Sequence, residues 1–416
     1  MSKRKVLSYA IKLIALFSWV GCTSAPVKVP PPDHSVPFPL HMALEGDALL
    51  VVGANTDDHF SDGKLVVIDT TAVDRVIKSG VPKNPIAWNS VVTSNVLIPS
   101  ASSMIALDSN TVTFASDSSS RLYRFSIRSG VLSCENAQKS IVDCKDTQSL
   151  SLKQSEPGYL QLIATNNNEK NLLISYRTSS QIELISLGTK MKHVRSFNFV
   201  DTLKSKNIKI SADEIIVTKK IQVEKNNEKS LVYFLLERQF KEDKSQPQGI
   251  YLLSINLSDL LNNEKISPSR VNFWDFKDKF FIDSAHDMHI DEAEQSVYIL
   301  AEKPESIFKF SLKSKTLLDT TSVCESATSM SVSKEQNRIF IPCYKDSRIA
   351  SFTKSPLSLD VVSEIHGQGP AKAVLDEKKK LIYVSFFDDG TLGIFDFNLK
   401  YLGKVFSTTS PDGIGL

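Results

Sequence analysis

The sequence predicts an all-β protein, and three observations lead to this fold class. Short apolar runs alternate with polar turns along most of the 416 residues, as expected for a series of short strands. Helical periodicity is scarce in the same segments. One pattern of strand, turn, strand, loop and strand recurs seven times. A repeat of about 40 to 50 residues with four strands is typical of a propeller blade, so we expect a seven-bladed β-propeller of four-stranded blades.

The second and third strands of each repeat locate the blades, because they are its most apolar parts. We expect second strands at 49–52, 111–115, 172–176, 232–236, 297–301, 339–342 and 382–385. We expect third strands at 65–69, 122–127, 182–187, 250–257, 307–312, 348–352 and 392–396. Seven such units close one disc, so we expect a single folded domain at 38–416 where length alone would allow two or three.

The last repeat resembles the YVTN-type β-propellers. Gly369-Pro370 opens its innermost strand, Tyr383-Val384 lies in the second strand, and Asp396 closes the third. The resemblance is good over this repeat, fair over the first, fifth and sixth, and poor over the other three. That family includes binding proteins and relatives of propeller lactonases, so the resemblance implies a fold and no single chemistry.

The first 21 residues predict a signal peptide. Their apolar run, 13–20, is too short to span a bilayer, which needs about 20 residues. The run ends at Gly21-Cys22, which resembles the lipobox of bacterial lipoproteins, although Trp19 departs from that pattern. The positive charges before and within this segment are Lys3, Arg4, Lys5 and Lys12. We therefore expect Cys22 to become the lipidated N-terminus; an ordinary secretory signal is the alternative.

Residues 22–37 predict a spacer between the lipid and the folded domain. Proline fixes φ and donates no backbone hydrogen bond, so a proline-rich run favours an extended chain over a packed element. The alternative is an irregular arm that lies along the domain. The lipid would be the membrane contact. We expect the bacterial cell envelope, with the protein on the outer membrane and facing the periplasm or the cell surface.

The charge balance gives no indication of a nucleic-acid partner. The four positive charges of the signal peptide leave 45 basic and 47 acidic residues in the mature chain. Nucleic-acid binding calls for a concentrated basic patch, which this composition does not provide.

The four cysteines after Cys22 form two pairs that are close in sequence. An oxidising compartment permits disulfides, so we expect Cys134 to bond Cys144 and Cys324 to bond Cys343. Neither spacing resembles a CxxC redox or zinc motif. Buried free thiols are the alternative, above all for the second pair, because Cys343 lies in an apolar strand.

The innermost strands should line a central channel, and strand alternation indicates which side chains face it. Alignment of the repeats puts one polar column in the channel and an apolar column between the blades. The polar column is His41, Met104, Gln161, Lys220, Asp287, Ser329 and Lys372. The apolar column is Met42, Ile105, Leu162, Ile221, Met288, Met330 and Ala373. We take His41, Asp287 and Lys372 as a possible site at the channel mouth; a merely hydrated channel is the alternative.

Metal sites are weakly indicated. His286 and His289 are three residues apart on one strand, so they should point in opposite directions and need a bulge to share a metal. Asp57, Asp58 and Asp62 offer oxygen ligands for calcium, but their spacing is not that of an EF-hand and a solvated turn is favoured. We expect no cofactor.

Catalytic motifs are absent from the sequence. It contains no GxSxG elbow, no HExxH and no phosphate-binding glycine loop. We therefore favour a non-enzymatic binding or scaffold protein, with a protein or small-molecule partner on one face of the disc. One alternative is a lactonase-like hydrolase that uses the channel mouth. A second alternative is an outer-membrane assembly factor of propeller architecture.

Overall fold

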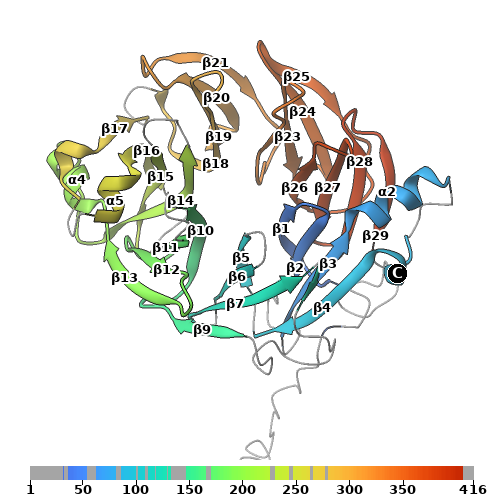
Figure 1. The fold of residues 1–416 in the computed structure, drawn as a ribbon. Helices are drawn as coiled ribbons and strands as arrows, with labels where there is room; N and C mark the ends of the chain where they lie inside the picture. The colour runs from blue at the N-terminus through green and yellow to red at the C-terminus, as the bar shows by residue number, and fades with distance from the viewer. Residues whose placement is uncertain are drawn as a thin grey trace, which may run out of the picture.

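The chain forms a ring of seven antiparallel sheets, which confirms the predicted seven-bladed β-propeller (Figure 1). The computed structural model describes residues 31, 36–53, 62–80, 86–99, 102–107, 111–117, 119–128, 130–132, 147–164, 170–224, 230–242, 247–262, 266–276 and 280–405. Six sheets have four strands, and the second blade has five. Within the four-stranded blades the strands follow one another along the chain from the centre to the rim, whereas in the second blade both β8 and β9 pair with β7.

The first four blades contain the longer insertions. Blade 1 is built from β1 (Pro39–Glu45), β2 (Ala48–Gly53), β3 (Gly63–Asp69) and β4 (Val92–Ile98). Blade 2 is built from β5 (Ser102–Leu107), β6 (Thr111–Ser116), β7 (Arg121–Arg128), β8 (Val131–Leu132) and β9 (Gln148–Ser151). Blade 3 is built from β10 (Pro157–Ala164), β11 (Lys170–Tyr176), β12 (Ile182–Ser186) and β13 (Lys192–Phe197). Blade 4 is built from β14 (Glu214–Glu224), β15 (Leu231–Phe240), β16 (Pro247–Asn256) and β17 (Asn272–Asp275).

The last three blades are more regular. Blade 5 is built from β18 (Ser284–Asp291), β19 (Ser296–Lys303), β20 (Ser306–Ser311) and β21 (Leu317–Ser322). Blade 6 is built from β22 (Ser331–Val332), β23 (Arg338–Cys343), β24 (Arg348–Lys354) and β25 (Leu357–Val362). Blade 7 is built from β26 (Pro370–Asp376), β27 (Leu381–Phe386), β28 (Thr391–Asp396) and β29 (Tyr401–Val405).

Short helices lie in the connections between strands. They are α2 (Thr70–Lys78), α3 (Trp88–Val91), α4 (Val200–Ser205), α5 (Leu257–Asn262) and the 3-10 turn η3 (Pro268–Arg270). Asp69 caps α2, because its side chain accepts hydrogen bonds from the backbone N–H groups of Thr71 and Ala72. In the described part of the chain, no helix is both long and apolar enough to cross a membrane.

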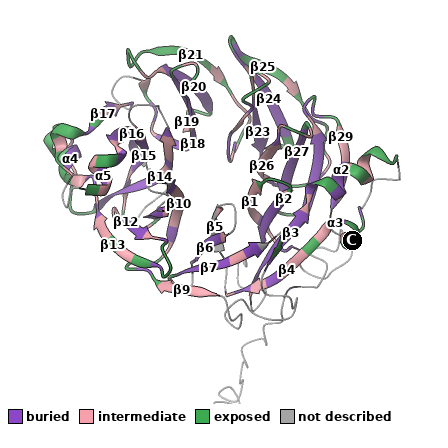
Figure 2. Cartoon of the chain, viewed as in Figure 1, coloured by how far each residue is buried: buried purple, intermediate pink, exposed green. Residues whose placement is uncertain are grey.

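Burial follows the position of each strand in its blade (Figure 2). The middle strands pack against neighbouring blades on both faces, so β2 and β27 are continuous apolar runs that are almost wholly buried. The rim strands have one exposed face, and β21 alternates between exposed and partly buried residues. All the second and third strands form where the sequence predicts them, because a buried apolar run is a local signal.

Blades 1 and 7 meet to close the ring. Each takes its strands from one continuous segment, and the backbone N–H of Ile86 donates a hydrogen bond of 2.8 Å to the carbonyl of Lys404 at the rim of blade 7. The two blades share one apolar cluster, which includes Val51 and Tyr383. Val36 is fully buried in this cluster, so the described end of the proline-rich arm packs against the ring.

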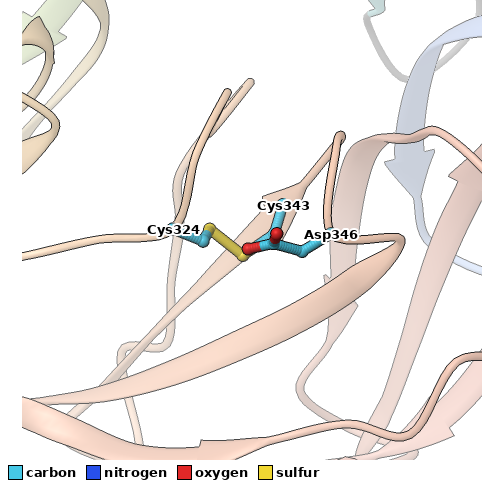
Figure 3. Close-up of side chains that lie close together, drawn as sticks. All are labelled: Cys324, Cys343 and Asp346. Atoms are coloured by element: carbon cyan, nitrogen blue, oxygen red, sulfur yellow. A yellow bond between two sulfur atoms is a disulfide. The ribbon is translucent and has the colours of Figure 1, made fainter.

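One predicted disulfide is present in the structure. Cys324 bonds Cys343, with 5.6 Å between their Cα atoms, and ties the entry of blade 6 to the end of β23 (Figure 3). Asp346 lies beside the two sulfur atoms, but bonded sulfurs offer no thiolate to a metal. Cys22, Cys134 and Cys144 lie outside the described residues, so lipidation and the other disulfide stay predictions.

Candidate functional site

A bulge recurs at the same level of the innermost strands, which surround the centre of the ring (Figure 1). The register shifts in six of them, near the first paired residue in five strands and further along the strand in β14. A β-bulge bends its strand and re-aims the side chains that follow it. In four blades the residue directly after the bulge is polar, and these residues are His41, Lys220, Asp287 and Lys372.

The Lys220–Asp287 ion pair crosses between blades 4 and 5. Lys220 Nζ lies 2.8 Å from Asp287 Oδ1, and only 3% of Asp287 is exposed. The other carboxylate oxygen accepts a hydrogen bond of 3.0 Å from the backbone N–H of Met330 in blade 6. The carboxylate of Asp287 is therefore fully engaged by its neighbours, and it connects three blades.

The pair stays ionised. Burial by itself would raise the pKa of Asp287, but the ammonium groups of Lys220 and Lys372 hold it below its usual value. Burial likewise opposes the charge on Lys220, yet Asp287 and Tyr159 raise the pKa of its ammonium. Lys220 Nζ also lies 5.0 Å from the centre of the Tyr159 ring, at a distance suited to a cation–π contact.

Lys372 differs from Lys220 because it lacks a carboxylate of its own. Its backbone N–H donates to Ser385 Oγ at 3.1 Å, but no carboxylate of the described residues lies within 4.0 Å of its Nζ. Burial lowers the pKa of this ammonium, the nearby charge of Lys220 lowers it further, and Asp287 only partly opposes them, so that the pKa is about 8. At neutral pH Lys372 therefore remains mostly protonated.

His41 is the neutral member of this layer of channel residues, which also includes Lys220, Asp287 and Lys372. Burial lowers its pKa to about 3, assisted by the positive charges of Lys372, Arg177 and Lys220. Among the described residues, this layer has two ammonium groups, one carboxylate and a neutral imidazole, and therefore one net positive charge at neutral pH. The structure thus brings together the three predicted residues, His41, Asp287 and Lys372, with Lys220 and Tyr159.

Tyr159 is a site residue that the sequence alignment missed. In blade 3, Pro157 pairs with Tyr176 just as Pro370 pairs with Phe386 in blade 7. Tyr159 therefore occupies the level of Lys372, and Gln161 lies two residues further along. Counting from the second strand was wrong here, because five residues separate the paired Ala164 and Lys170 at the hairpin. The proline two residues before the channel residue was the better marker.

The two predicted metal candidates have different outcomes. The strand bulges at 286, where His286 Nε2 lies 4.0 Å from Glu302, whereas burial keeps the pKa of His289 near 4. Among the described residues, no third ligand groups with both histidines. Asp57 and Asp58 of the acidic loop lie outside the described residues, so that calcium site stays a prediction.

A cavity of about 610 Å³ lies over blades 3 to 5 and has walls of mixed charge. Its wall includes Arg177, which pairs with Asp117 at 2.7 Å, and Lys219, whose Nζ lies 3.5 Å from Glu237. Glu237 is buried and also accepts hydrogen bonds from Ser284 Oγ at 3.1 Å and from the Ala285 N–H at 3.3 Å. Glu156 and Glu302 also line this cavity, so its wall has more acidic than basic groups, in contrast to the channel layer.

Comparison with known proteins identifies the class by fold alone. No family model and no curated protein matches the chain. A solved protein of unknown function from Desulfotomaculum acetoxidans is 12% identical, with a TM-score of 0.53, over 85% of this chain and 95% of that one. A protein from Bacteroides fragilis named as a candidate 6-phosphogluconolactonase is 12% identical, with a TM-score of 0.56, over 86% of this chain and 94% of that one.

A third solved structure shares the fold to the same extent. The β-propeller domain of Cps50 (Swd1) from Myceliophteria thermophila is 11% identical, with a TM-score of 0.54, over 86% of this chain and 96% of that one. Identities this low support a shared fold and say nothing of a shared activity. The chain is a seven-bladed β-propeller, and its function has to be argued from its own channel.

Proposed function

We propose that this protein binds a small anionic molecule in its central channel, without chemical turnover, while a lipid on Cys22 holds it in the bacterial envelope. The observation that carries the proposal is Lys372. It is an ammonium group in the channel with no carboxylate of the described residues within 4.0 Å. A carboxylate or similar anion would supply the missing countercharge.

The channel favours an anion for electrostatic reasons. Charges interact more strongly where protein replaces water, so an excess positive charge attracts an anion more strongly there than at the surface. Lys220 stays charged because it is paired with Asp287. The two side chains are therefore in position before a ligand binds. A concave site with a few converging polar groups is the usual form of a small-molecule site.

Anion titration tests this proposal. Oxalate and sulfate would be titrated into the mature protein by calorimetry, alongside the Lys372→Met and Lys345→Met variants. We expect Lys372→Met to weaken binding by at least tenfold, corresponding to about 1.4 kcal/mol. Lys345 is an exposed lysine paired with Glu325, so its variant should bind like the wild type. Equal binding by all three proteins, or no binding of either anion at millimolar concentration, would contradict the proposal.

The proposed lipid anchor on Cys22 can be tested separately from anion binding. Mass spectrometry of the mature protein from membranes should find an acylated Cys22 as the first residue, and Cys22→Ser should release the protein from the membrane fraction. A mature N-terminus at another residue would overturn the anchor and leave the anion site untouched.

Lactone hydrolysis is a second candidate, because His41 is a neutral imidazole beside two ammonium groups. The low pKa of His41 makes it a weak base, so it would orient an attacking water as a hydrogen-bond acceptor, and ammonium groups stabilise a developing oxyanion. The name of the Bacteroides fragilis neighbour suggests a phosphorylated lactone, which is an anion, as the compound to assay. Hydrolysis that His41→Gln abolishes would favour this candidate over simple binding.

A further inference from the structure

The cavity over blades 3 to 5 is charged oppositely to the channel layer. Three acidic and two basic side chains line it, and these are Glu156, Glu237, Glu302, Arg177 and Lys219. The guanidinium of Arg177 is already paired, because it lies 2.7 Å from the carboxylate of Asp117. The wall of the cavity therefore has an excess of negative charge, which attracts a cation.

The extra residues of two β-bulges form part of this wall. In blade 4 the register of β14 skips Lys219, and in blade 5 the register of β19 skips Glu302. A bulge re-aims the side chain of its extra residue away from the regular alternation of the strand. Lys219 therefore lines the cavity, while the next residue, Lys220, pairs with Asp287 in the channel layer.

Two of the glutamates come from neighbouring blades and converge on one hydroxyl group. Ser284 Oγ lies 3.1 Å from Glu237 Oε2 and 2.5 Å from Glu302 Oε2. A hydroxyl group has one proton, so Ser284 can donate to only one of these carboxylates at a time. His286 Nε2 lies 4.0 Å from Glu302, but burial lowers the pKa of His286, so its imidazole is neutral at pH 7. A cation between the two carboxylates would reduce their repulsion.

Gln239 gives a separate indication of a ligand. Its side chain lines the cavity, and only 7% of the residue is exposed. Its amide Nε2 donates to Glu237 Oε1, and this contact sets the orientation of the amide because a carboxylate can only accept. Gln239 Oε1 then has no hydrogen-bond donor among the described residues. Buried acceptors are nearly always hydrogen-bonded, so an N–H group of a ligand would supply the donor that this oxygen lacks.

We propose that this cavity binds a small organic cation, whose guanidinium or primary ammonium group donates hydrogen bonds to Gln239 Oε1 and to the carboxylates of Glu237 and Glu302. The volume of about 610 Å³ suits a small molecule. A metal ion fits less well, because in the described part of the chain no three ligand atoms of His, Cys, Asp or Glu that include either glutamate lie within 4.8 Å of one another. This inference goes beyond the proposed anion binding, because it concerns another cavity and a ligand of opposite charge.

Two compounds of nearly the same shape test whether the ligand has to be a cation. Butylguanidinium and the uncharged butylurea would be titrated into the mature protein by calorimetry. We expect butylguanidinium to bind at least tenfold more tightly than butylurea, corresponding to about 1.4 kcal/mol. Equal binding of the two compounds, or no binding of butylguanidinium at millimolar concentration, would overturn the inference. If calcium chloride at the same concentration abolished the binding of butylguanidinium, the cavity would be a metal site and the organic cation would be overturned.

Variants locate the binding in this cavity. Glu302→Gln removes one charge from a partly exposed position and should weaken the binding of butylguanidinium at least tenfold. Gln239→Leu removes the acceptor without a donor and should weaken it several-fold. The control is Glu335→Gln, since Glu335 is an exposed carboxylate paired with Lys380, and this variant should bind within about twofold of the wild type. Wild-type affinity in Glu302→Gln would overturn the inference even if Gln239→Leu did not fold.

Oxalate titration of the same proteins keeps this inference apart from the proposed function. Glu302→Gln should lose butylguanidinium binding and retain oxalate binding, because Glu302 does not belong to the channel layer. A wild-type protein that bound butylguanidinium but no oxalate would contradict the proposed function and support the cation site. The reverse result would overturn the cation site and leave anion binding in place.

Discussion

Two regions of the ring contain a pair of lysines out of bulk water, and only one region pairs both of them. Between blades 5 and 6, Lys354 Nζ lies 2.8 Å from Asp291, and Lys309 Nζ lies 2.7 Å from Glu294. In the channel, Lys220 and Lys372 share Asp287, which is the one carboxylate that the described residues place near both.

The different pairing of these lysines distinguishes buried charges that stabilise the fold from those that are free for a ligand. Lys309 also donates to Ser355 Oγ at 2.8 Å and to the Lys354 carbonyl at 3.1 Å, so the interface satisfies its own donors. A balanced set of buried charges holds two blades in register, whereas an unbalanced set attracts a countercharge from outside.

The largest expected effect is at the interface. Lys354→Met would leave the largely buried carboxylate of Asp291 without its ammonium, and removal of one partner from a buried pair typically costs about 3 to 5 kcal/mol. Urea unfolding should show a loss of that size. A loss below about 1 kcal/mol would contradict the structural role of this pair.

The same substitution in the channel should behave differently. Lys372→Met removes a charge that the folded state disfavours, so the free energy of unfolding should stay within about 1 kcal/mol of the wild type at pH 7 or rise. Anion binding should fall in this variant although its stability does not. Destabilisation as large as that of Lys354→Met would mean that Lys372, like Lys354, stabilises the fold.

The pH dependence of stability should have opposite signs at the two lysines. The pKa of Lys372 is about 8 in the folded state and about 10.4 when unfolded, so the unfolded chain binds the extra proton between these values. The wild type should therefore gain stability relative to Lys372→Met as pH rises from 8 to 10. Burial opposes the charge of Lys354, but Asp291 and Glu294 raise its pKa in the folded protein.

The interface lysine consequently contributes stability that is fully present below its unfolded pKa and is lost as pH rises through its folded pKa. The wild type should keep its full advantage over Lys354→Met up to about pH 10 and lose it only in stronger base. Between pH 7 and 10, unfolding curves of the three proteins should show the wild type gaining on Lys372→Met and keeping a constant margin over Lys354→Met; parallel curves would remove the distinction between the two regions.

The smallest effect is expected at the surface. Lys345 and Glu325 form an ion pair with 59% and 55% of their side chains exposed. Solvent screens such pairs, so Lys345→Met should change the free energy of unfolding by less than about 0.5 kcal/mol. A larger change would show that ion pairing by itself, and not burial, determines how much each lysine contributes to the free energy of unfolding.

The strands of every blade could be placed from the sequence because their signal is local. Apolar runs such as 49–52 and 382–385 must be buried wherever they lie, and the turns between them limit their length. The Cys324–Cys343 bond could be predicted because the two cysteines are only 19 positions apart in a chain expected to be exported. The channel residues were only partly predictable, since a two-residue error in blade 3 replaced Tyr159 with Gln161.

The sequence by itself determined the all-β class, the seven blades and the positions of their strands. Only the tertiary structure decided that Lys220 meets Asp287 and that Lys372 has no partner of this kind in the described part of the ring. Strand periodicity extends over a few neighbouring residues, whereas the charge state of a lysine depends on groups that the closed ring brings together from distant parts of the chain. Bulges in the inner strands then set which side chain faces the channel.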